Sequence, residues 1–246
     1  MFSIFKKKYS GPVDLSGLRC DMHSHLLPGI DDGSTSPQHS ITLINGLKDL
    51  GYEKLVTTPH IISDLYRNDA QTIGAAWNVL KPVIEEEQVG VPLRYAAEYY
   101  LDDYFDRLLL SKTPLLCIDQ NKVLVEFSFV TAPFDFKNKI FQIQIEGYQP
   151  VLAHPERYLY FNNKVYDDLK EAGCLFQVNL LSLAGYYGKG PLDVAHYLIK
   201  KDYVDLLGTD LHHERHLDSL RNGHRMMDSV NHLLDSGRLL NPTLFN

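Results

Sequence analysis

Short apolar runs alternate along the chain with longer segments in which apolar residues recur every three or four positions. The short runs predict seven strands, at residues 18–22, 54–57, 93–97, 122–125, 150–153, 174–178 and 203–208. The longer segments predict helices between them. Seven successive strand–helix units favour a parallel sheet with helices outside, and at this length we expect an α/β fold closed into an irregular, distorted TIM-like barrel.

Three of the predicted helices are indicated by clear local signals. Ser36 is a good N-cap for a helix that has Pro37 in its first turn and ends at Gly51. Pro191 opens a second helix. A last long helix carries an apolar stripe made of Leu220, Met227, Val230 and Leu234. Such stripes are typical of core packing.

Composition limits the class of protein. The 246 residues carry a formal net charge of −7 with 44% hydrophobic residues, which is typical of a globular protein and argues against a general nucleic-acid binder. Three cysteines without a CxxC pair indicate reduced thiols, and no apolar run is long enough to span a bilayer. We therefore expect a cytoplasmic protein with an extended arm at residues 1–17, including a solvated basic stretch at residues 6–8, and one domain at residues 18–246.

Chemistry-bearing side chains follow six of the seven predicted strands, and Asn179 follows the other. In chain order they are Asp21, His23 and His25, then His60, Glu98, Glu126 and His154, and finally Asp210 and His212. The carboxyl ends of barrel strands share one mouth, so these groups are expected to converge there. A buried carboxylate is costly without a cationic partner, which favours metal ions as the explanation of the cluster.

Two local patterns refine this hypothesis. His23 and His25 are two residues apart, and such side chains point to the same side of an extended chain. The turn Asp31-Asp32-Gly33 either returns a carboxylate to the mouth or is a plain turn with solvated charge. Imidazole and carboxylate without thiolate suit Mn, Fe or Zn, and the large number of ligands favours two or three ions. A pair of ions is a known clamp for in-line displacement at phosphorus.

Together these motifs resemble the polymerase-and-histidinol-phosphatase (PHP) superfamily. The branch they resemble is that of the manganese-dependent bacterial protein-tyrosine phosphatases of capsular and exopolysaccharide systems. The resemblance runs in order from about Leu18 to the last helix. It is carried by His23-Ser24-His25, Pro28–Gly33 with Asp32, Thr58-Pro59-His60, Glu98, Val125-Glu126-Phe127, Ala153–Tyr158 and Asp210-Leu211-His212.

The resemblance implies a distorted seven-stranded barrel with a trinuclear centre that binds Mn²⁺, or Fe or Zn as substitutes. It implies as metal ligands His23, His25, Asp32, His60, Glu98, Glu126, His154, Asp210 and His212. It also implies an activity, the hydrolysis of phosphotyrosine by a metal-activated water. The implied partner is a bacterial tyrosine kinase of polysaccharide synthesis or export.

Two arginines are candidates for binding the phosphate. Arg157 has the geometry for a bidentate clamp, with a surface ion pair to Glu156 as the alternative. Arg215 is a second candidate, although the segment around it departs from the family pattern, with Leu211 and His213 beside His212. The six other histidines are predicted not to be ligands, and of these His213 and His216 adjoin the mouth.

Other phosphatase chemistries do not fit the chain. A cysteine phosphatase needs Arg six residues after the nucleophile, and those positions hold Leu26, Val123 and Leu180. The segment 185–190 is glycine-rich but lacks P-loop spacing, and reads as a flexible loop beside the substrate. The alternatives left open are a small-molecule phosphatase such as histidinol-phosphate phosphatase, a metal nuclease and a non-catalytic metal-binding scaffold.

Overall fold

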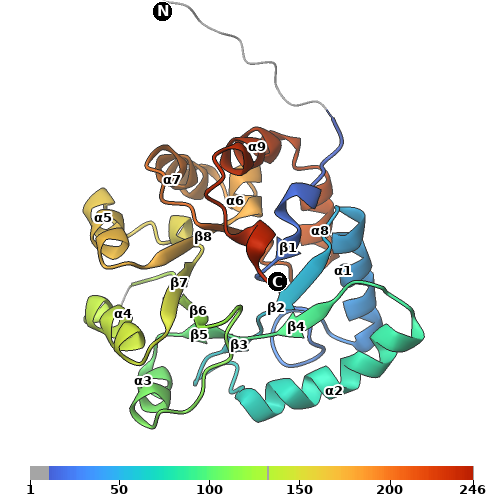
Figure 1. The fold of residues 1–246 in the computed structure, drawn as a ribbon, viewed down its shortest axis with the longest axis horizontal. Coiled ribbons are helices and arrows are strands. Elements are labelled where there is room, and N and C mark those ends of the chain that lie inside the picture. The colour runs from blue at the N-terminus through green and yellow to red at the C-terminus, as the bar shows by residue number, and fades with distance from the viewer. Residues whose placement is uncertain (1–10, 132, 246) are drawn as a thin grey trace, which may run out of the picture.

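The computed structural model describes residues 11–131 and 133–245, and within them the chain winds in order around a central bundle of strands (Figure 1). The strands are β1 (Cys20–Asp21), β2 (Lys54–Thr57), β3 (His60–Ile61), β4 (Leu93–Tyr95), β5 (Glu98–Tyr100), β6 (Lys122–Glu126), β7 (Gln149–Ala153), β8 (Leu175–Asn179) and β9 (Leu206–Gly208). Every strand pair is parallel, which confirms the predicted α/β class.

The helices form a ring outside the strands (Figure 1). They are α1 (Pro37–Asp49), α2 (Ala70–Glu86), α3 (Asp103–Leu110), α4 (Phe136–Ile145), α5 (Asn163–Glu171), α6 (Leu180–Ala184), α7 (Lys189–Lys200), α8 (Glu214–Arg221) and α9 (Met227–Asp235). Short 3-10 turns are η1 (Ser16–Leu18), η2 (Pro155–Arg157), η3 (His224–Met226) and η4 (Asn241–Thr243). None of the helices in these described ranges is long and apolar enough to cross a bilayer.

The second and third predicted strands continue beyond a break. Pro59, which has no N–H to donate, separates β2 from β3, and two alanines separate β4 from β5. The breaks divide the barrel into a three-stranded sheet, β1-β2-β4, and a six-stranded sheet, β3-β5-β6-β7-β8-β9. Backbone bonds from His25 N to Leu211 O (2.9 Å) and from Asp210 N to His23 O (2.8 Å) join the two sheets beyond β1 and β9. The predicted barrel is therefore present, with its distortion at these breaks.

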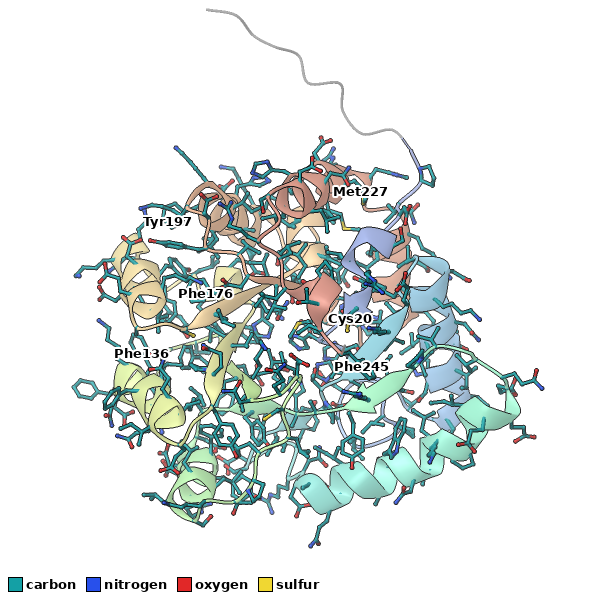
Figure 2. The ribbon with its side chains drawn as sticks, in the orientation of Figure 1. Cys20, Phe136, Phe176, Tyr197, Met227 and Phe245 are labelled. Carbon is teal, nitrogen blue, oxygen red and sulfur yellow. The ribbon has the colours of Figure 1, made fainter. Side chains whose placement is uncertain are left out.

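Alternation along the strands sorts side chains into two cores. Leu124 of β6, Val151 of β7 and Leu206 of β9 belong to a small core inside the barrel, closed by Leu244. Their neighbours in sequence, such as Val123 and Val125, pack outward in the larger core beneath the helices. Figure 2 labels Phe176 of β8, which belongs to this outer core, and Phe136 of α4 and Tyr197 of α7, which pack against it.

Two predictions about the chain ends need correction. The last long helix is in fact α8, η3 and α9, because the chain turns at Gly223, where a Cβ would lie 3.1 Å from the carbonyl oxygens of Ser219 and Leu220. The expected extended arm is not extended near the body, since Leu15 is fully buried and Ser16–Leu18 form η1. The basic stretch at residues 6–8 lies outside the described residues.

One buried amide connects β1 and β9 beneath the inner core. Asn241 of η4 accepts a hydrogen bond from Leu207 N (2.8 Å) and donates to Leu207 O (2.7 Å) and Cys20 O (3.0 Å). The side chain thus replaces the ladder bonds that two adjacent barrel strands would otherwise make. Figure 1 shows this C-terminal segment lying over the centre of the strands.

We expect Asn241→Ala to lower the free energy of unfolding by roughly 2–4 kcal/mol, because it leaves three buried backbone groups without partners. Urea titration followed by circular dichroism measures this change. Asn222→Ala is the matched control, since that amide is exposed after α8, and a change within about 0.5 kcal/mol is expected there. Equal stability of the two variants would contradict the bridging role of Asn241.

Candidate metal centre

The structure brings all nine predicted ligands together at the carboxyl ends of the strands. Four overlapping groups have ligand atoms within 4.8 Å of one another: His25, Asp32, His60 and His212; His23, His154 and Asp210; His23, His25 and Glu98; and His60, Glu98 and Glu126. Every predicted ligand belongs to at least one group. Asp32 therefore does return to the mouth, although its side chain is 52% exposed.

Strand alternation and strained turns aim these side chains. Glu126 lies two residues after Leu124 and so points to the same side, into the barrel. His154 and Asp210 each follow a strand in left-handed backbone conformation, with φ of 37° and 52°. Such conformations cost about 1–3 kcal/mol for residues other than glycine and concentrate at functional sites. Both turns direct a side chain inward at the point where a strand ends.

The nine residues form two layers. Asp32, His60, Glu126, His154, Asp210 and His212 line an open cavity of about 220 Å³. Beneath them His23, His25 and Glu98 have no solvent exposure. The carboxylate of Glu98 contacts imidazole nitrogens of His23 (3.2 Å), His60 (3.1 Å) and His154 (3.1 Å). One buried carboxylate is therefore shared among several imidazoles.

Three atoms face one another without hydrogen bonds. His60 Nδ1 lies 3.1 Å from Glu98 Oε2 and 3.0 Å from Glu126 Oε1. All three atoms are buried and none has a hydrogen-bond partner among the described residues. Buried polar atoms without partners are rare, and a shared cation would satisfy all three. The donor set of one imidazole and two carboxylates suits a divalent metal.

Hydrogen bonds to the Nδ1 atoms fix the orientation of three other imidazoles. His23 Nδ1 lies 2.8 Å from Gln177 Oε1, and His25 Nδ1 lies 2.8 Å from Asp31 Oδ2. His212 Nδ1 lies 2.8 Å from the carbonyl oxygen of Asp210. With acceptors at Nδ1, each ring presents Nε2 to the cluster. This arrangement, with one nitrogen tied to an acceptor, is the usual one for metal-ligating histidine.

The charges of the cluster stabilise one another. Burial raises the pKa of Glu98, but His23 and His60 outweigh it and hold that pKa well below its ordinary value. Burial likewise opposes ionisation of Asp210, yet His23 and His212 keep its pKa well below the usual range. Burial and the neighbouring His25 lower the pKa of His212 to about 4. Both carboxylates are thus anionic at neutral pH, as ligands for a cation must be.

Three supporting residues were not identified from the sequence. Asp31 is buried at its carboxylate and also accepts from the backbone N–H of His60 (3.1 Å) and of Gly33 (3.0 Å). Gln177 holds His23, and Asn179 donates from Nδ2 to Asp210 Oδ2 (2.8 Å). The two amides occupy alternate positions of β8, so their inward direction was available from the strand pattern. The double acidic turn gave no indication of which aspartate orients His25.

The two predicted arginines differ in position. Arg157 lines the cavity and its Nη1 donates to Asp210 Oδ2 (3.2 Å). The alternative ion pair with Glu156 is wrong, because that carboxylate is buried and accepts from Ser182 Oγ (2.6 Å) and Asn179 N (2.9 Å). Arg215 is exposed on α8 and is not among the residues that line the cavity, so its predicted phosphate contact lacks geometric support.

The histidines predicted not to be ligands stay outside the four groups formed by the described residues. His213 and His216 nevertheless line the cavity beside His212. His213 also caps α8 by accepting a hydrogen bond from His216 N. These two imidazoles belong to the wall of the cavity.

A closed parallel barrel with clustered imidazoles and carboxylates at the carboxyl ends of its strands is the arrangement of a metal-dependent barrel hydrolase. Residues 19–231 match the family described as "Capsular polysaccharide synthesis, CpsB/CapC". The chain therefore belongs to the CpsB/CapC family.

Individual relatives agree with this assignment. The chain is 27% identical over 194 residues to the tyrosine-protein phosphatase YwqE of Bacillus subtilis, covering 78% of this chain and 76% of that protein. It is 28% identical over 200 residues to the tyrosine-protein phosphatase CpsB of Streptococcus pneumoniae, covering 78% and 82%.

A solved structure shows the same fold. It comes from work on YwqE from Bacillus subtilis and CpsB from Streptococcus pneumoniae, which are described as unique metal-dependent tyrosine phosphatases. The match has a TM-score of 0.74 at 24% identity and covers 88% of this chain and 94% of that one. The predicted family and barrel are confirmed.

We expect Asp31→Asn to weaken metal binding roughly 10- to 100-fold, since the change removes the charge that orients His25. Titration of chelator-treated protein with Mn²⁺ by isothermal calorimetry measures the affinity. Asp49→Asn is the matched control, because its carboxylate is 71% exposed on α1 and should leave binding unchanged. Wild-type affinity in Asp31→Asn would show that this carboxylate does not support the centre.

Proposed function

We propose that this protein is a metal-dependent protein-tyrosine phosphatase that hydrolyses phosphotyrosine in capsular polysaccharide synthesis. Membership of the CpsB/CapC family and relatives named tyrosine-protein phosphatases support the activity. The observation that carries the proposal is the convergence of nine imidazole and carboxylate side chains, six of which line one cavity.

The nine residues can be assigned once each to three triads drawn from the four overlapping groups. One triad is His25, Asp32 and His212, whose group also contains His60; the second is His23, His154 and Asp210, and the third is His60, Glu98 and Glu126. Each triad supplies three ligand atoms, so every residue is used once. This division supports a centre of three ions, and the absence of thiolate supports Mn²⁺, with Fe or Zn as substitutes. Glu98 also approaches His23 and His25, which suits a carboxylate shared between ions.

The side chains around the cavity are suited to a phosphate monoester. When bound, divalent cations supply Lewis acidity for phosphoryl oxygens and make water nucleophilic at neutral pH. Arg157 presents a guanidinium whose planar fork matches two phosphate oxygens. Phe129 and Tyr187 line the same cavity as Arg157. Because a phenolate has a pKa near 10, it leaves without obligatory help from a general acid.

The family description, capsular polysaccharide synthesis, supports a proposal for the biological substrate. We assign as partner a bacterial tyrosine kinase of polysaccharide synthesis or export, acting in the cytoplasm. A cavity of about 220 Å³ with an open mouth admits a phosphorylated side chain that projects from a polypeptide.

We expect His154→Ala to lower turnover at least about 100-fold, because it removes one ligand from a triad. Elemental analysis should show a loss of about one metal ion per chain, and hydrolysis of p-nitrophenyl phosphate and a phosphotyrosine peptide with added Mn²⁺ measures activity. His196→Ala, at an exposed position on α7, serves as the control. Faster hydrolysis of histidinol phosphate than of the peptide by the wild type would favour a small-molecule phosphatase instead.

Arg157→Lys should reduce kcat/KM for the phosphotyrosine peptide about 10- to 100-fold, since a lysine cannot reproduce a bidentate contact with phosphate. Metal content should stay at the wild-type value. Steady-state kinetics and elemental analysis test both expectations, with Arg221→Lys as the control because that arginine pairs on the surface with Asp49 and Asp218. Unchanged kcat/KM would remove Arg157 from the substrate site.

A further inference from the structure

Two aromatic rings lie against the guanidinium of Arg157. Its central carbon lies 4.1 Å from the ring centroid of Phe129 and 4.3 Å from that of Tyr187. Both rings line the same cavity as the arginine. Contacts this close lie well within the range of cation–π interaction, and each stabilises the cation.

Different parts of the fold place the two rings. Phe129 lies in the loop between β6 and α4, where Ser128 accepts a hydrogen bond at its carbonyl from Tyr160 Oη (2.8 Å) and at its Oγ from Val130 N (3.1 Å). The Phe129 ring also stacks on buried Tyr158 with centroids 5.9 Å apart.

Tyr187 is placed by the glycine-rich segment that the sequence singled out. Gly185 and Gly188 flank Tyr186 and Tyr187 and have φ of 83° and 90°, values that residues with a side chain rarely adopt. Tyr186 packs edge-on against Tyr187 (5.1 Å) and His216 (5.1 Å). The segment therefore forms a defined turn, and this turn sets the position of the Tyr187 ring.

The contacts with the two rings use none of the N–H donors of the guanidinium. Among the described residues, Arg157 uses one donor, Nη1, for its hydrogen bond to Asp210. A guanidinium has five N–H donors, all in its plane. A second carboxylate would hold the arginine by consuming these donors and cancelling its charge, whereas aromatic faces hold it without doing either.

Asp210 does not depend on Arg157 alone. Its Oδ2 also accepts from Asn179 Nδ2 at 2.8 Å, and its Oδ1 faces His23 and His25 at 3.4 Å. The arginine can therefore turn donors toward a phosphate while the carboxylate keeps its place in the cluster.

We propose that Phe129 and Tyr187 are positioning residues that clamp Arg157 with its donor edge toward the phosphate of the substrate. The inference rests on the proposed phosphatase function. It also assigns a role to the segment from Gly185 to Gly188, which is to hold the Tyr187 ring of the clamp in place. The rings act through Arg157, so their effect depends on the presence of that arginine.

A double-mutant cycle tests this dependence. Phe129→Leu and Tyr187→Leu are made in the wild type and in Arg157→Ala, and each protein is loaded with Mn²⁺. The readouts are the dissociation constant of inorganic phosphate by calorimetry, KM and kcat for a phosphotyrosine peptide, and metal content. We expect each leucine variant to raise the dissociation constant and KM roughly 2- to 30-fold, with kcat changed less than about twofold.

The Arg157→Ala background shows whether the two rings act on phosphate binding directly or through Arg157. In Arg157→Ala the same leucine changes should shift phosphate binding by less than about twofold. Tyr187→Phe keeps the ring and should bind phosphate as the wild type does. Phe141→Leu, an exposed phenylalanine on α4, is the control for loss of a surface ring. Equal effects in both backgrounds, or wild-type binding in both leucine variants, would overturn the clamp.

Binding of phosphate keeps this test separate from the proposed activity. If the wild type binds phosphate and shows the cycle but hydrolyses no phosphotyrosine, the clamp stands and the phosphatase proposal fails. If the wild type hydrolyses the peptide and the cycle shows no coupling, the clamp fails alone. A leucine variant with reduced metal content would also contradict the clamp, since it would show that the ring supports the metal centre.

Discussion

The buried carboxylate of Glu98 is the interaction on which the site depends. It has no exposure to water and lies within 3.2 Å of nitrogens from His23, His60 and His154. A charge removed from water at this depth costs several kcal/mol unless cations and hydrogen bonds surround it. The imidazoles around Glu98 supply that compensation, and metal ions would supply more. The rest of the mouth is arranged so that these groups can meet.

The breaks in the barrel help to bring Glu98 and the imidazoles around it together. Because β3 and β5 are separate from β2 and β4, His60 and Glu98 begin a sheet as paired residues in parallel register. An unbroken β2 carrying a proline in its middle would lose a ladder bond there. The left-handed residues His154 and Asp210 add the same kind of local cost at the ends of β7 and β9. The same breaks and strained turns of the backbone therefore make the barrel irregular and assemble the site.

The sequence was most informative where local pattern decides the structure. Strand ends rich in His, Asp and Glu located eight of the nine converging residues, because parallel strands place their carboxyl ends at one mouth. The ninth, Asp32, was given as a ligand only by the family resemblance. Contacts between residues far apart in the chain could not be predicted from the sequence. Nothing near Arg157 in the chain indicates that Asp210 is its partner or that Phe129 and Tyr187 contact its guanidinium. The break at Gly223 was also missed, since an apolar stripe continues across it and periodicity does not register a turn.

A single alternation pattern builds both the interior of the barrel and the site. Along β6 the inward positions pass from Leu124, in the inner core, to Glu126, which lines the cavity. Along β8 they pass from Leu175 to Gln177 and Asn179, which hold His23 and Asp210. The inward face of β6 and of β8 is therefore apolar at its start and polar at its end. At the apolar end Asn241 and Leu244 close the barrel, so the polar end can stay open without exposing the core.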